Sequence, residues 1–397
     1  MRQVSTLAAI GITAALVTAL AACSSDSDGA GGARRSGDTI KLMVIGELSS
    51  PVMSLPQLVV GGQAGANEVN AGGGVNGHKI ELLSCNTQAD PNVAATCARK
   101  AVSEKVSAVV GMLTVQSNSV QSILAAAKIP TIANAAFNAL DYTSPNSFPA
   151  TASPVANVGM ALTMPGYQDC KHPAFLAMNN PAAQDGGNRV KNVYAKLNLD
   201  LKIVNVNPDA GDIRPQVATL LSGGSDCVHA SVTPSIALSL IKNVADSGQK
   251  VKLSLMMTTT PLESLRQLGA AAQGVYASSP FQEPGTSDAA DKFATAMTAV
   301  DPEAIQDSSA QGAYTGVLIF ARAAESLTDF SAPKVLDALT NAKNIDAGTI
   351  APIPSFRADG GVPGAPRINV TSLYSYVFEG NDFKLVTPNP VDIRPGL

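Results

Sequence analysis

Short apolar segments alternate with longer helix-like segments over most of the chain, and this alternation restricts the fold more than any other feature. We expect strands at residues 40–45, 80–84, 108–110, 131–133, 174–178, 202–206, 228–232, 253–257 and 274–277. We expect helices between them at residues 58–70, 91–104, 117–127, 156–164, 188–198, 215–221, 236–245 and 262–268. Strands and helices in this order form parallel sheets covered by helices on both faces. The sequence therefore predicts an α/β fold.

The length of the chain indicates two sheets rather than one. A single hydrophobic core stops growing near ~250–300 residues, and this chain has 397. Two proline-containing stretches, residues 144–154 and 279–285, lie where the chain would leave one sheet for the other.

The N-terminal residues are typical of an export signal. Arg2 precedes an apolar run at residues 7–20. This run is shorter than the ~20 residues that a transmembrane helix needs. The run ends in Leu-Ala-Ala-Cys at residues 20–23, which resembles the lipobox of bacterial lipoproteins. We expect a signal peptide at residues 1–22, lipid on Cys23, a flexible tether at residues 23–38 and a protein on the outer face of the cell membrane. An ordinary signal peptide or a buried helix is the alternative.

Four further cysteines allow three pairings in an oxidising compartment. Cys97 lies on the apolar stripe of a predicted helix that follows Asp90-Pro91, and it faces the strand that ends near Cys85. Cys170 and Cys227 each precede an apolar strand. We favour the pairs Cys85–Cys97 and Cys170–Cys227 over four free thiols. No CxxC motif or histidine cluster indicates a metal site.

The charge and the motifs exclude several classes of function. The chain has 27 basic and 31 acidic residues and a net charge of −4, so a basic surface for nucleic acid is not expected. Gly72, Gly74 and Gly77 satisfy G-x-G-x-x-G but follow a helix and precede a strand, the reverse of a dinucleotide-binding loop. Because there are only three separated histidines and no nucleophile motif, we expect neither an enzyme nor a cofactor.

Three segments carry a family resemblance: IKLMVIGELSSP at residues 40–51, GANEVNAGGGVNGHKIEL at 65–82 and TQADPNVAATCA at 87–98. They resemble the type I periplasmic binding proteins, in particular the branched-chain amino-acid (leucine/isoleucine/valine) receptor family of ABC transporter lipoproteins. The resemblance implies two Rossmann-like lobes joined by a three-crossover hinge, with the solute between them. The first lobe would comprise residues 39–150 and 280–345, and the second residues 151–279 and 346–397.

The same resemblance implies a function. The protein would be a monomer that captures a small amino-acid-like or related polar metabolite and delivers it to the permease and ATPase subunits of an ABC importer. A lipid-tethered sensor or adaptor that reports to a signalling partner is the alternative.

The resemblance also places ligand-binding residues at the ends of strands: Ser49, Ser50, Thr114, Gln116, Asn134, Phe137, Asp185, Thr233 and Thr259. Phe137 stands where relatives have a threonine that holds the ligand carboxylate, and Asp185 stands near the position of a family tyrosine. These departures argue against an ordinary α-amino acid and leave an amide, a modified amino acid, an aromatic acid or another small metabolite open. The alternatives are core packing for Phe137, a cap on a helix beginning near residue 188 for Asp185, and ordinary loops or turns for the threonines and Gln116.

Overall fold

The structure is a computed structural model that describes residues 39–50 and 53–397. The predicted signal peptide, Cys23 and the tether lie outside the described residues. Among the helices of the described ranges, none has both the length and the hydropathy needed to cross a bilayer.

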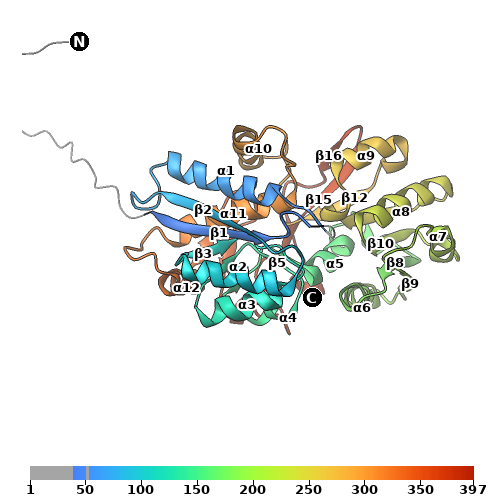
Figure 1. Cartoon of the computed structure of the whole chain (residues 1–397). Helices are drawn as coiled ribbons and strands as arrows, with labels where there is room; N and C mark the ends of the chain where they lie inside the picture. Colours follow the sequence, from blue (N-terminus) through green and yellow to red (C-terminus); the bar gives the residue numbers. More distant parts are fainter. Residues whose placement is uncertain (1–38, 51–52) are drawn as a thin grey trace, which may run out of the picture. The chain divides into compact units, whose positions relative to one another are not determined.

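The first sheet is parallel and has the strand order β2-β1-β3-β4-β6. Its strands are β1 (Ile40–Gly46), β2 (Ile80–Asn86), β3 (Ala108–Val110), β4 (Thr131–Ile132) and β6 (Ser147–Phe148). One face packs against α1 (Gln57–Ala71), α11 (Ser308–Ala323) and α12 (Ala332–Asn341). The other face packs against α2 (Pro91–Ser103) and α3 (Ser117–Ala126), as Figure 1 shows.

Helices on both faces explain the continuous apolar run of β1. Leu42 and Val44 belong to the core under α1 and α11, whereas Met43 and Ile45 belong to the core under α2 and α3. All four side chains are buried. A strand in this position has no solvated face, so its sequence does not alternate between apolar and polar residues.

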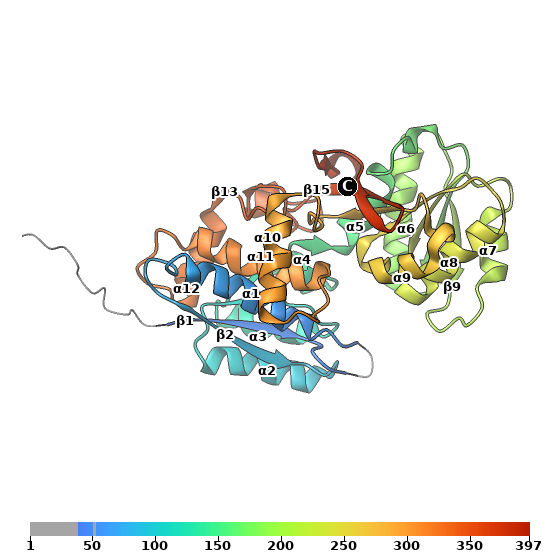
Figure 2. The ribbon, with the colours of Figure 1, turned by 90° about the horizontal axis from the view of Figure 1, so that it is seen from above.

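The second sheet has the order β16-β15-β12-β11-β10-β8-β9, and β17 pairs with β15. Its parallel strands are β8 (Pro173–Met178), β9 (Lys202–Val206), β10 (Cys227–Ser231), β11 (Lys252–Met256) and β12 (Tyr276–Ser279). The antiparallel strands are β15 (Ser372–Glu379), β16 (Asp382–Leu385) and β17 (Val391–Asp392). One face packs against α5 (Ser153–Leu162) and α6 (Pro181–Ala195), and the other against α7 (Arg214–Leu221), α8 (Pro234–Asp246) and α9 (Leu262–Leu268), which Figure 2 also shows.

Shorter elements complete the described chain. They are α4 (Ala139–Thr143), α10 (Asp288–Val300), the paired strands β5 (Ala135–Ala136) and β7 (Thr151–Ala152), and the paired strands β13 (Lys343–Ile345) and β14 (Ile353–Ser355). Single 3-10 turns occur at Tyr167–Asp169, Met257–Thr259, Gly269–Ala272, Ala358–Gly360 and Arg394–Gly396.

The chain crosses between the two sheets three times, as the predicted fold class requires. It leaves the first lobe after β7, returns to it after β12 and leaves it again after β14. The predicted α/β fold with two parallel-sheet lobes is thus confirmed. Ile350, Ile353 and Phe356 pack in the core of the first lobe, so this lobe's core includes residues beyond 345.

The helix predicted from residue 188 begins earlier than expected. Helix α6 starts at Pro181, and the side-chain oxygen of Asn180 accepts a hydrogen bond from the backbone N–H of Ala183 at 2.9 Å. Gly186 lies inside this helix, where α6 packs closely against α5. A Cβ atom at this position would come within 2.5 Å of the Asn157 side chain. Close helix packing therefore accounts for a residue that normally weakens a helix.

Both favoured disulfides are present. Cys85 at the end of β2 pairs with Cys97 on α2, and Cys170 before β8 pairs with Cys227 at the start of β10. The Asp90 carboxylate caps α2 by accepting from the N–H groups of Asn92 and Val93 at 2.8 and 2.9 Å. This cap sets the start of α2, and Cys97 then faces inward.

The two disulfides should differ in their contribution to stability. They join residues 12 and 57 positions apart, for which loss of chain entropy in the unfolded state predicts about 3 and about 4 kcal/mol. We expect the double variant Cys170→Ser/Cys227→Ser to lose more free energy of unfolding than Cys85→Ser/Cys97→Ser in urea titrations. A larger loss from the Cys85–Cys97 pair would contradict this ranking.

Candidate functional site

Polar side chains gather where β1, β3 and β4 end, at the carboxyl edge of the first sheet. In open α/β sheets this is the edge at which ligands bind. Gly46 is the last residue of β1. A Cβ atom at this position would lie only 2.8 Å from the backbone oxygen of Leu113. The glycine therefore lets the loop after β3 approach the residue that follows, Glu47.

Glu47 is fully buried and joins the end of β1 to the loop after β3. Its Oε1 accepts hydrogen bonds from the Thr114 hydroxyl at 2.7 Å and from the Val115 N–H at 3.1 Å. Thr87 lies 3.4 Å from the same hydroxyl. Within the described residues, Glu47 Oε2 has no hydrogen-bond partner although it is buried.

Asp141 is a second buried carboxylate, on α4 after β4 and β5. Its Oδ2 accepts from the Ser117 hydroxyl at 2.6 Å and from the N–H groups of Phe137 and Asn138 at 3.2 and 3.0 Å. The Gln121 amide reaches Oδ1 at 3.3 Å. Burial raises the pKa of this carboxyl, and the hydrogen bonds oppose that rise.

The other residues predicted for the first lobe lie on the same edge. The Ser50 hydroxyl donates to the Met53 oxygen at 2.7 Å, and the Ser49 oxygen accepts from the Asn86 side chain at 2.8 Å. Gln116 donates to the Ala89 oxygen at 3.1 Å.

The last two residues predicted for this lobe differ in burial. Asn134 is fully buried; its amide nitrogen donates to the Ser147 hydroxyl at 3.2 Å, while its oxygen has no partner in the described residues. The Phe137 side chain is 46% exposed, so it does not belong to the core.

The residues predicted for the second lobe have local partners. Thr233 caps α8 after β10, and Thr259 donates to the Met256 oxygen at 2.9 Å after the neighbouring strand β11. Asp185 lies inside α6 and pairs with Arg189 at 2.6 Å, so it does not cap a helix beginning near residue 188. Burial raises the pKa of Tyr142 on α4 to about 12, and the charge of Asp185 adds to this rise.

Two acidic residues at this edge, Glu47 and Asp141, were not among the predicted site residues. The available signal for Glu47 was an acidic residue directly after a buried strand. Its buried surroundings depend on Thr114, 67 positions away, and no local pattern reveals that contact.

A buried arginine connects the third crossover to the first lobe. The Arg367 guanidinium lies 4.4 Å from the centre of the Phe148 ring, and its Nε donates to the Ser147 oxygen at 2.8 Å. One terminal nitrogen has no partner in the described part of the chain. Burial lowers the pKa of this group to about 10.

Glu283 in the second crossover is half-buried, and one of its carboxyl oxygens is fully buried. Burial raises the pKa of Glu283 to about 8, and the negative charges of Asp307 and Asp382 add to the rise. Its Oε1 has no hydrogen-bond partner in the described residues. The backbone N–H of Glu283 donates to the Tyr376 hydroxyl at 3.1 Å, which attaches this crossover to β15.

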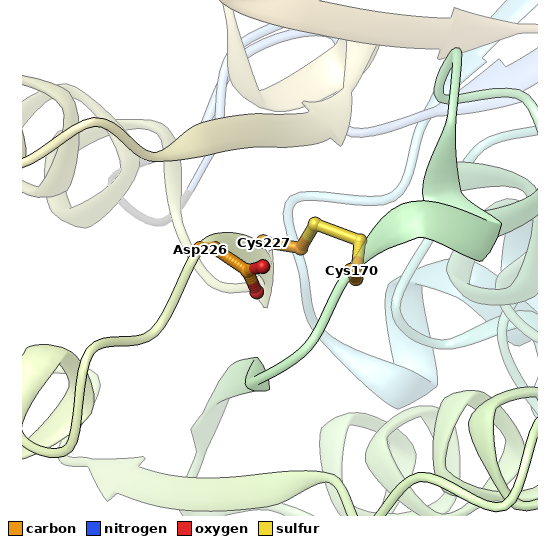
Figure 3. A group of neighbouring side chains, drawn as sticks. All are labelled: Cys170, Asp226 and Cys227. Atoms are coloured by element: carbon orange, nitrogen blue, oxygen red, sulfur yellow. A yellow bond between two sulfur atoms is a disulfide. The ribbon is translucent and has the colours of Figure 1, made fainter.

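Cys170, Asp226 and Cys227 are close enough together to suggest a metal site, as Figure 3 shows. The two sulfur atoms are bonded to each other. The Asp226 carboxylate accepts from the N–H groups of Lys171 and His172 at 2.8 and 2.9 Å. Since a disulfide offers no thiolate, this group links the starts of β8 and β10 and does not form a metal site.

Comparisons with known proteins agree with this architecture. A family model described as periplasmic binding protein matches residues 39–368. The chain belongs to this family. No curated protein matches the chain significantly in sequence.

Solved structures with the same fold include substrate-binding proteins of ABC transporters. A fatty acid ABC transporter substrate-binding protein from Thermomonospora curvata is 19% identical, with a TM-score of 0.72 over 89% of this chain and 92% of that one. A branched-chain amino acid transporter substrate-binding protein from Streptococcus pneumoniae, in complex with isoleucine, is 19% identical, with a TM-score of 0.70 over 89% and 99%. A solute-binding protein from R. palustris, in complex with 4-hydroxybenzoate, is 20% identical, with a TM-score of 0.71 over 89% and 96%.

The raised pKa of the half-buried Glu283 should make stability depend on pH. Its pKa of about 8 in the folded protein exceeds the ordinary value of 4.5, so the folded state binds the proton more tightly than the unfolded state does. The free energy of unfolding should therefore fall as pH rises from about 4.5 to about 8, by up to ~1.4 kcal/mol per pH unit.

Urea titrations across this pH range test the effect. Glu283→Gln should flatten the fall, whereas Glu303→Gln, at an exposed position, should leave it unchanged. An equal slope in the wild type and Glu283→Gln would contradict the assignment.

Proposed function

We propose that this protein is an extracytoplasmic solute-binding protein of an ABC importer. It captures a small amino-acid-like or related polar metabolite between its two lobes and delivers it to a membrane permease. Membership of the periplasmic binding protein family supports this proposal. The observation that carries it is the polar carboxyl edge of the first sheet, where buried polar groups lie at the expected position of a ligand.

The solute site in this proposal draws on both lobes. The first lobe contributes the edge that contains Thr114, Gln116 and Asn134, and the second contributes the strand ends at Thr233 and Thr259. The lobes in this proposal comprise residues 39–150 with 280–345 and residues 151–279 with 346–397, and Phe356 also packs in the core of the first. Three crossovers form a hinge that permits closure around a solute.

Binding without chemical conversion fits the side chains at this edge. Asp141 is held by four donors, and Glu47 is held by Thr114 and Val115. The ligands named for similar structures are a fatty acid, isoleucine and 4-hydroxybenzoate, so the fold accepts chemically different solutes. A sensor that reports the closed form to a signalling partner is the alternative.

Two measurements test the importer proposal. A defined panel of small metabolites should raise the melting temperature for at least one solute, because a ligand at one hundred times its Kd adds ~2.7 kcal/mol to stability. Uptake of that solute, labelled with ¹⁴C, should fall in cells that lack the gene and recover when it is restored. Binding with unchanged uptake would favour the sensor.

We also propose that a lipid on Cys23 anchors the protein. The lipobox-like segment Leu-Ala-Ala-Cys supports this. Cells fed an alkyne fatty acid should label the wild type in the membrane fraction. Cys23→Ala should be unlabelled, and the matched control Ser24→Ala should behave as the wild type does. Labelled, membrane-bound Cys23→Ala protein would refute the anchor.

A further inference from the structure

Two residues in the loops at the carboxyl edge of the first sheet have their backbone N–H groups occupied by carboxylates of the protein. Such loops normally offer backbone N–H groups to a bound anion. Here the Val115 N–H donates to Glu47 and the Phe137 N–H donates to Asp141. The side chains of both residues are 46% exposed, yet their N–H groups are paired within the protein.

The unpaired buried atoms of Glu47 and Asn134, at the ends of β1 and β4, are both acceptors. Glu47 Oε2 and Asn134 Oδ1 are both buried, and neither has a hydrogen-bond donor in the described residues. Glu47 follows β1 and Asn134 follows β4, so the two flank the loop after β3, the strand between them in the sheet. An unpaired buried acceptor is costly, and an unpaired carboxylate oxygen more so.

The charge of this edge is negative, which also favours a solute group that donates hydrogen bonds. Glu47 and Asp141 form no ion pair with a basic residue in the described part of the chain. Arg367, the buried cation of the third crossover, is stacked on Phe148 and donates from Nε to the Ser147 oxygen; its unpaired terminal nitrogen forms no ion pair with Glu47 or Asp141 in the described residues. A solute carboxylate placed at this edge would therefore meet two carboxylates and no free loop N–H from Val115 or Phe137.

We propose that the first lobe recognises a cationic nitrogen group of the solute, an ammonium or amidinium, whose N–H donors bind Glu47 Oε2 and Asn134 Oδ1. This inference rests on the proposed solute-binding function and specifies the class of solute. An ammonium carries three donors and no acceptor, which suits an edge with two unpaired acceptors and a negative charge. Glu47 is the specificity-determining residue.

Matched pairs of solutes with the same carbon skeleton test this inference. We choose isoamylamine with isovalerate, 4-hydroxybenzylamine with 4-hydroxybenzoate, and octylamine with octanoate. For any skeleton that binds in calorimetry at pH 7, the amine should bind at least tenfold more tightly than the carboxylate. A carboxylate that binds as tightly as its amine would overturn the inference and leave the solute-binding function intact.

Variants assign the effect to Glu47. Glu47→Gln should weaken amine binding at least tenfold, whereas Glu81→Gln, at an exposed position on the neighbouring strand β2, should not change it. Unchanged amine binding in Glu47→Gln would overturn the assignment.

If none of the probes binds, that result counts against the proposed solute-binding function itself. A measurement without ligand then tests the inference about Glu47. Glu47→Gln removes the buried charge, keeps Oε1 as the acceptor for Thr114 and Val115, and replaces the unpaired oxygen with a neutral amide NH2 group. Its melting temperature at pH 7 should exceed that of the wild type, while Glu81→Gln should match the wild type. If Glu47→Gln melts at the same or a lower temperature, protein or solvent already satisfies this oxygen and the inference is wrong.

Discussion

The carboxylate of Glu47 determines how the first lobe presents its binding edge. It joins the end of β1 to the loop after β3 through Thr114 and Val115, in a position with no exposure to solvent. Gly46 permits this contact because its backbone can lie against Leu113. Hydrogen bonds to a buried charge are stronger than those between neutral groups, so the loop is held in one conformation.

Asp141 has the corresponding role for the loop after β4, where it accepts from Phe137, Asn138 and Ser117. The two carboxylates occupy the N–H groups of Val115 and Phe137, while Glu47 Oε2 and Asn134 Oδ1 are unpaired acceptors within the described residues. The arrangement costs stability because both charges are desolvated. Such a cost is common at functional sites, where binding a partner compensates for it.

The sequence predicted most of the parallel strands because apolar runs and helix caps are local signals, whereas the antiparallel strands β15, β16 and β17 were not predicted. The strand at Lys202–Val206 and the helix at Leu262–Leu268 match the predicted bounds, and Cys97 faces Cys85 as the helical stripe indicates. The start of α6 was missed because Gly186, which weakens helices, is required by contact with Asn157. Glu47 was missed as a site residue because its partner Thr114 is distant in sequence.

Amide hydrogen exchange at Val115 and Phe137 tests the account most directly. Both side chains are 46% exposed, and their amides would exchange rapidly unless the N–H groups were bonded to Glu47 and Asp141. NMR of the ligand-free, isotope-labelled protein should show both amides strongly protected. Exchange of both at the rate of unprotected loop amides would contradict the claim that the protein's own carboxylates occupy this edge.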